Sequence, residues 1–118
     1  MDFKIDKLDE FILVQVQKEK LDTTIAPGLK SELVLLSGNN EKNILLDLSK
    51  CNYCDSSGLS AILVANRLCK NSDGVFVLAG LQPAVERLIS VSQLDTVITI
   101  APTSDDGIEM MRKALQSK

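Results

Sequence analysis

Three short apolar runs alternate with helical patterns from residue 43 to the end of the chain, and this order constrains the fold most. The apolar runs are residues 43–49, 75–79 and 96–100. Runs of this length, bounded by polar residues, are typical of buried strands. The helical patterns begin near Ser57, Gln82 and Ser104. The resulting β-α-β-α-β-α order predicts an α/β fold in which parallel strands are joined by right-handed crossovers.

The N-terminal segment predicts an antiparallel hairpin. Residues 3–8 and 11–16 read as two strands, and Asp9 and Glu10 form a short turn between them. Strands joined by so short a turn pair antiparallel. We therefore expect the hairpin to add an antiparallel edge to the parallel strands, which gives a mixed sheet of about five strands.

A further helix is predicted between the hairpin and the first buried strand. Its apolar side chains recur with the i, i+4, i+7 period of a helix, at Leu29, Leu33 and Leu36. Thr23 or Thr24 can cap its start. Pro27 suits its first turn, and Gly38 suits its end. Together with the three later helices, this segment gives about four helices in all.

Length and composition fit a single domain that covers residues 1–118. The chain is 45% hydrophobic and 25% charged, which is close to the average for globular proteins. No apolar run approaches the roughly 20 residues of a transmembrane helix. The first ten residues alternate charged and apolar side chains, whereas a signal peptide needs an unbroken apolar stretch. We therefore expect a cytoplasmic protein without a membrane span.

The residue content excludes several classes of function. The chain contains no histidine, so His-based catalytic triads and His metal ligands cannot form. The net charge is −3, aromatic residues make up 3%, and no Lys/Arg cluster is present. Nucleic acid is therefore not an expected partner. A P-loop is also missing, and we expect no cofactor.

The three cysteines are expected to be structural. Cys51 and Cys54 form a C-x-x-C motif, and Cys69 is the third cysteine. A zinc site would need a fourth ligand, and a thioredoxin-like pair would open a helix rather than end a strand. The sequence therefore favours buried structural thiols over a metal or redox role, and we predict no metal site.

The most informative segment is Asp55–Leu59, at the junction between a predicted strand and a predicted helix. Ligand sites in open α/β sheets gather beyond the carboxyl ends of the strands. The first N–H groups of a helix are unpaired and its N-terminus is positive, so an anion on Ser56 would be favoured there. Asp and Ser are also ordinary helix-capping residues, and that interpretation remains open. Gly58 would allow another backbone to approach closely.

A helical wheel of residues 56–70 places two leucines among polar side chains. Leu59 and Leu63 fall on the side of the helix that carries Ser56, at the i, i+3, i+7 positions. A small apolar strip beside an exposed serine often marks a partner surface. An equally good interpretation is that a loop or a neighbouring helix of the same domain covers these two leucines.

The chain resembles the STAS-domain anti-sigma factor antagonists. The segments that carry the resemblance are Ile44–Ser49 followed by Asp55–Leu59, Glu19–Asp22 followed by Ala26 and Leu29, and Leu78–Leu88. Cys51 and Cys54 stand where relatives commonly have apolar residues. Pro27 and Gly28 are unusual for this family.

The resemblance implies both a STAS-like fold and a mechanism. Such proteins bind an anti-sigma factor that is also a serine kinase and thereby free a sigma factor. The kinase phosphorylates the serine after the aspartate, here Ser56, which ends binding until a phosphatase resets the protein. The resemblance and the helical wheel together place the partner-binding surface at Asp22, Asp55, Ser57, Gly58, Leu59 and Leu63. Asp22 has a second interpretation as a cap of the first helix.

Two other functions compete with this interpretation. A STAS-like component of a lipid or anion transport system would dock to a transporter subunit without phosphorylation. A small enzyme using Ser56 with Lys50 is the weaker alternative, because no orienting base or oxyanion donor pair is evident. The serine at position 56 in a chain of this length favours the regulatory, non-enzymatic interpretation.

Overall fold

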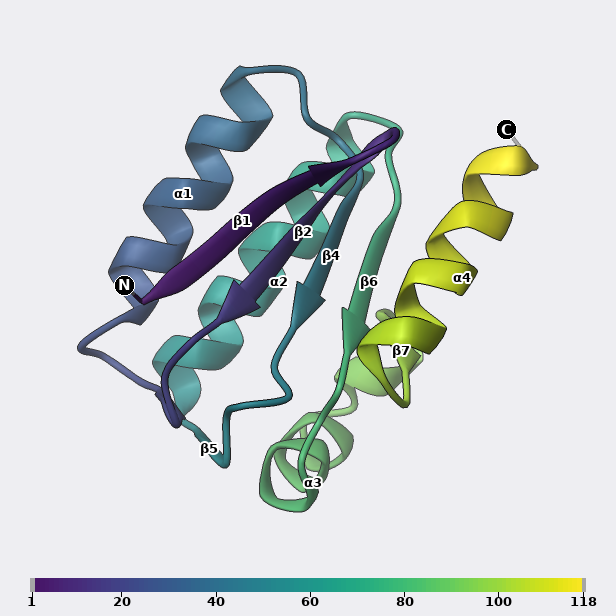
Figure 1. Cartoon of the computed structure of the whole chain (residues 1–118). Helices are drawn as coiled ribbons and strands as arrows, with labels where there is room; N and C mark the ends of the chain where they lie inside the picture. The colour runs from purple at the N-terminus through teal and green to yellow at the C-terminus, as the bar shows by residue number, and fades with distance from the viewer. Residues whose placement is uncertain (1, 118) are drawn as a thin grey trace.

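The computed structural model describes residues 2–117; Met1 and Lys118, the two ends of the expected domain, lie outside the described residues. Within this range, five strands form one mixed sheet in the spatial order β1-β2-β4-β6-β7 (Figure 1). Their bounds are Phe3–Leu8 for β1, Phe11–Val16 for β2, Ile44–Asp47 for β4, Phe76–Ala79 for β6 and Thr99–Ala101 for β7. The expected mixed sheet of five strands is confirmed.

The hairpin and the parallel strands pair as the sequence predicts. β1 and β2 run antiparallel, with Phe3 opposite Val16 and Leu8 opposite Phe11. Asp9 in the turn has a φ of 49°, which is the left-handed conformation that tight hairpin turns require. β2–β4, β4–β6 and β6–β7 are all parallel pairs. The carboxyl ends of β4, β6 and β7 therefore meet at one end of the sheet.

Four helices surround this sheet within residues 2–117 (Figure 1). Their bounds are Ala26–Gly38 for α1, Ser56–Asn71 for α2, Pro83–Val91 for α3 and Ser104–Gln116 for α4. α1 and α2 pack against each other on one face, and α4 contacts β4, β6 and β7 on the other. α3 lies at the end of the sheet where the parallel strands finish.

Alternating side chains of β2 reach two separate apolar clusters. Ile12, Val14 and Val16 belong to the larger cluster, which α1 and α2 cover. Phe11 and Leu13 belong to the smaller cluster, which includes Met111 of α4. Because successive strand residues point to opposite faces, a strand that is apolar throughout must be covered on both sides. This explains why β2 has no polar face over most of its length.

Two boundary predictions were wrong. Neither Thr23 nor Thr24 caps α1: the N-cap residue is Ile25, which makes no side-chain cap hydrogen bond. Residues 96–100 were expected to form one strand, but Leu94–Thr96 form a short 3₁₀ helix, η1, and β7 begins only at Thr99. The reason is local, because the N–H groups of Val97 and Ile98 both donate to the carbonyl of Leu94 and hold the turn.

Candidate functional site

Ser56 is the first residue of α2, and its side chain is exposed. Asp55 precedes it as the N-cap in an extended conformation, with φ −110° and ψ −171°. One carboxylate oxygen of Asp55 accepts hydrogen bonds from the N–H groups of Ser57 (3.0 Å) and Gly58 (3.1 Å). Ser57 is half-buried, whereas Ser56 is exposed. The two adjacent serines therefore differ in accessibility, in the direction expected from the sequence.

A two-stranded parallel sheet outside the main sheet positions this helix start, and sequence analysis missed it. It consists of β3 (Lys20–Leu21) and β5 (Tyr53–Cys54). Lys20 is paired with Tyr53, and Leu21 is paired with Cys54. The N–H of Asp55 also donates to the carbonyl of Leu21 at 3.4 Å. Strands of only two residues leave no periodic pattern that a sequence could reveal.

This pairing brings Asp22 to the start of α2. Asp22 follows Leu21 directly, just as Asp55 follows Cys54, so the two aspartates leave adjacent strands at the same end. The Asp22 carboxylate accepts hydrogen bonds from the Thr24 hydroxyl (2.5 Å) and the Thr24 N–H (3.0 Å). These two bonds lower the pKa of the Asp22 carboxyl below its ordinary value. Asp22 therefore carries a negative charge at neutral pH, and its backbone adjoins the strand that leads into α2.

Asp22 is not the side-chain cap of α1. Its carboxylate bonds Thr24 within its own turn, while its main-chain carbonyl accepts from the N–H groups of Ile25 (3.2 Å) and Ala26 (2.8 Å). The capping interpretation is therefore wrong. The carboxylate instead holds the turn that connects β3 to α1.

Gly58 belongs to the packing beneath the site rather than to its surface. The residue is buried. A Cβ atom added to it would lie 2.5 Å from Cys54 Sγ and 2.9 Å from Leu21 Cγ, and would also collide with the Leu21 carbonyl oxygen. The close backbone approach expected of Gly58 is thus present. The predicted direct contact of Gly58 with a partner is not supported, because its position is enclosed.

The apolar strip, Leu59 and Leu63, is only partly open. Both side chains are half-buried and pack against the larger apolar cluster. The strip therefore contributes to the domain's own packing as well as to the surface beside Ser56. The alternative that the helical wheel left open, in which neighbouring elements cover these two leucines, is thus partly correct.

All three cysteines are buried free thiols. Cys51 Sγ donates to the carbonyl of Lys18 at 3.2 Å. Burial raises the pKa of Cys51 to about 11 and the pKa values of Cys54 and Cys69 to about 12. The thiols are thus protonated at neutral pH, and a thiolate is the form that reacts or binds metal. Within residues 2–117, no group of three or more metal-ligating side chains forms.

The side chain of Lys50 is hydrogen-bonded to a residue other than Ser56. Its Nζ donates to Gln17 Oε1 at 2.7 Å. Lys50 therefore has a structural partner on the segment that follows β2. This contact gives no support to an enzyme that uses Ser56 with Lys50.

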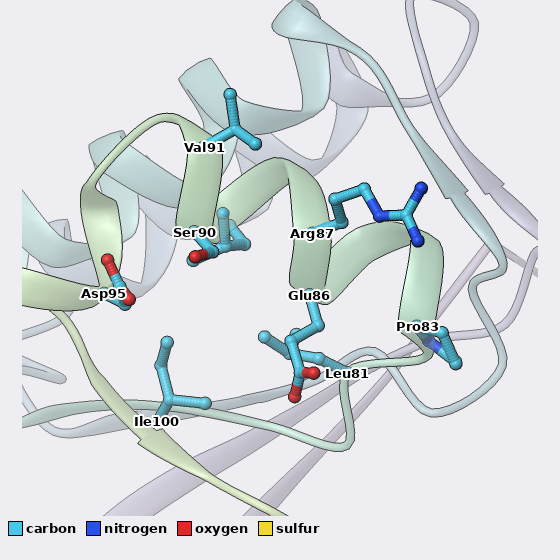
Figure 2. A pocket seen from close by; sticks show the side chains of 9 residues that line it. Leu81, Pro83, Glu86, Arg87, Ser90, Val91, Asp95 and Ile100 are labelled. Atoms are coloured by element: carbon cyan, nitrogen blue, oxygen red, sulfur yellow. The ribbon is translucent and has the colours of Figure 1, made fainter.

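A surface hollow of about 550 Å³ lies elsewhere, between α3 and β7 (Figure 2). Asp95 and Ile100 line it across from Glu86 and Leu81. Its lining includes neither Ser56 nor any other residue predicted to surround Ser56. The candidate site is thus an exposed helix start that lies outside this hollow.

Asp55→Ala is expected to lower the free energy of unfolding by about 1–2 kcal/mol, because two N–H groups of α2 lose their acceptor. Asp55→Asn is the matched control, since asparagine caps helices about as well as aspartate, and its loss should stay within about 0.5 kcal/mol. Urea denaturation of the three proteins measures both values. Equal losses in the two variants would show that the charge of Asp55, and not its capping bonds, stabilises the helix.

Comparison with known proteins identifies relatives of nearly the same length. The family model of the STAS domain matches residues 2–107. BtrV of Bordetella bronchiseptica, a candidate anti-sigma factor antagonist, is 24% identical over 115 residues, which cover 98% of each chain. None of the helices in residues 2–117 has the length and hydrophobicity that crossing a bilayer requires.

Two solved structures illustrate the shared fold. The crystal structure of a candidate anti-sigma factor antagonist of Thermotoga maritima is 28% identical, with a TM-score of 0.79, and the match covers 93% of this chain and 94% of that one. The phosphorylated form of the Bacillus cell fate determinant SpoIIAA is 17% identical, with a TM-score of 0.73 and coverage of 92% and 97%. At the latter identity the likeness shows the fold alone.

Proposed function

Because the chain belongs to the STAS-domain family, we propose that it is an anti-sigma factor antagonist whose binding is switched by phosphorylation of Ser56. Its partner is an anti-sigma factor that is also a serine kinase, and binding of that kinase frees a sigma factor. A phosphatase returns the phosphorylated protein to the binding form. The observation that carries the proposal is an exposed serine at the first position of α2, directly after its capping aspartate.

The surroundings of Ser56 suit a binding surface that excludes additional negative charge. Asp55 directly precedes it, and Asp22 leaves the adjacent strand β3 at the same end, so two carboxylates belong to this region of the surface. The half-buried Ser57 and the apolar strip, Leu59 and Leu63, continue the surface along α2. A partner that covers this surface would meet the carboxylates with cationic or hydrogen-bonding groups and the leucines with an apolar patch.

Phosphorylation would change this surface far more than it would change the fold. A phosphate adds about −1.5 to −2 charges at neutral pH. Beside Asp22 and Asp55, and enclosed by a partner, those charges repel the carboxylates and lose their hydration. In the free protein the phosphate stays in water at a helix N-terminus, where negative charge is favoured. Binding would therefore be lost while the domain stays folded.

The test is phosphorylation of the protein by the anti-sigma factor kinase that co-purifies with it. With ATP, we expect one phosphate per chain, mapped by mass spectrometry to Ser56. Ser57→Ala should be phosphorylated like the wild type, and Ser56→Ala should not be phosphorylated. Modification of Ser57 with Ser56 untouched would overturn the assignment. A chain that captures a transporter subunit and no kinase would favour the transport-component function.

A further inference from the structure

The outer strand β1 presents an unpaired edge. In the described part of the chain, β1 pairs with β2 and with no other strand. The N–H of Gln17 donates to the carbonyl of Asp2 at 2.7 Å. Hydrogen-bonded pairs alternate along an antiparallel ladder, so Lys4, Asp6 and Leu8 direct their backbone groups toward β2. The backbone groups of Phe3, Ile5 and Lys7 therefore face outward and can bond another strand.

Among the registers that pair most of β1 through its outward-facing backbone groups, one makes the charges on this edge self-complementary. When two copies of β1 pair antiparallel with Ile5 opposite Ile5, Lys4 of each copy lies opposite Asp6 of the other. Shifting the register by two residues in either direction places Lys4 opposite Lys4 or Asp6 opposite Asp6, and like charges opposite each other are destabilising. In the register centred on Ile5, the outward-facing N–H and C=O groups of Ile5 would bond those of Ile5 in the second copy, and those of Phe3 would bond those of Lys7. Hydrogen bonding admits this register and the two shifted ones alike, and charge selects the register centred on Ile5.

Lys4 and Asp6 are available for such pairs. Neither side chain has an ion-pair partner among the described residues, whereas Lys7 pairs with Glu41 at 2.6 Å. Lys4 and Asp6 would meet at the non-hydrogen-bonded positions of the new ladder, where side chains of opposite strands are closest. A row of lysines alone would block edge pairing by repulsion. Opposite charges at alternate positions do not have this effect.

A groove with apolar and charged walls lies beside the same edge. Half-buried Phe3 and Ile5 line this groove of about 670 Å³ together with Gly28 of α1, and Lys4 and Glu32 line it as well. In the register centred on Ile5, the two Ile5 side chains adjoin across the two-fold axis. Burial of this surface adds a hydrophobic contribution to the ladder.

We propose that the protein forms a symmetric dimer in which β1 pairs antiparallel with β1 of a second copy, with Ile5 opposite Ile5. The two five-stranded sheets then become one continuous sheet. The interface uses the same surface of both copies, as two-fold symmetry requires. It is separate from the phosphorylation proposed for Ser56, and neither proposal depends on the other.

Sedimentation velocity over a concentration series tests the dimer through a charge exchange. Wild type should dimerise, and Lys4→Asp should raise the dimer dissociation constant by about tenfold or more, because two attractive pairs become repulsive. The double variant Lys4→Asp/Asp6→Lys restores opposite charges and should dimerise like wild type. Lys42→Asp, on an exposed loop residue, is the control with the same change in net charge as Lys4→Asp.

Hydrogen exchange gives a second measurement. In the dimer, the N–H groups of Phe3, Ile5 and Lys7 should become protected as the concentration rises, while the Lys42→Asp control behaves like wild type. A wild-type chain that stays monomeric at every concentration would overturn the proposal. So would a dimer that Lys4→Asp leaves intact, since its interface would lie elsewhere.

Discussion

Gly58→Ala is expected to lower the free energy of unfolding by about 1–3 kcal/mol, the usual range for overpacking a well-packed interior. The new methyl group would overlap Cys54 Sγ and the backbone of Leu21. Main-chain atoms of a paired strand cannot rotate away as a flexible side chain can. The clash would therefore push β3 away from the start of α2. For a domain of this size, the midpoint of thermal unfolding should fall by about 4 °C for each kcal/mol.

Gly38→Ala is the matched control. Gly38 ends α1, and an added Cβ there would meet nothing within 4 Å. Because alanine is the better helix former, this variant should be neutral or more stable by up to about 1 kcal/mol. Thermal and urea unfolding of both variants measure the difference. A Gly58→Ala variant as stable as wild type would show that β3 can move without loss and that Gly58 does not fix the site.

The fold was predictable to the extent that its elements leave a periodic pattern. The alternation of apolar runs and helical patterns predicted the parallel strands, and the short Asp9–Glu10 turn predicted the hairpin. Boundaries were less accurate where a local hydrogen bond decides them. The carbonyl of Leu94, which holds the η1 turn, is an example. The β-branched side chains around residue 97 favour a strand, but the turn holds these residues out of the strand, so β7 begins only at Thr99.

The candidate site was predictable in its local part and not in its supporting part. The Asp-Ser pattern at the start of a helix indicates that Asp55 is the cap and that Ser56 is exposed, because capping is a matter of adjacent residues. The pairing of β3 with β5 joins segments more than thirty residues apart in the sequence, Lys20 with Tyr53. Only the structure shows this pairing, and with it the reason why position 58 is glycine and why Asp22 lies near Ser56.

The half-buried state of Leu63 illustrates the same limit. A helical wheel assigns a side chain to an angle about one helix axis, and Leu63 falls in the polar sector. Burial depends on which neighbouring elements reach that angle, and Leu63 packs against the larger apolar cluster. A surface position on an isolated helix can therefore be part of the core edge in the domain.

Ser56→Asp is expected to weaken binding of the anti-sigma factor kinase by about tenfold or more relative to Ser56→Ala. The reason is that a third carboxylate would join Asp22 and Asp55 at one surface. Like charges brought together in an interface cost several kcal/mol of binding free energy, and each 1.4 kcal/mol or so raises the dissociation constant about tenfold. Ser56→Ala keeps the surface neutral at this position. It should bind as tightly as unphosphorylated wild type and should not be released by ATP.

Affinity by calorimetry and unfolding temperature should be measured together for these variants. Exposed substitutions usually change stability by no more than about 0.5 kcal/mol, and the helix N-terminus favours the added charge. Both Ser56 variants should therefore melt within a few degrees of wild type. Gln116→Glu adds the same charge at an exposed position near the end of α4 and should bind like wild type. Equal affinities for Ser56→Ala and Ser56→Asp would show that residue 56 does not face the kinase, and docking to a transport component would then be the better proposal.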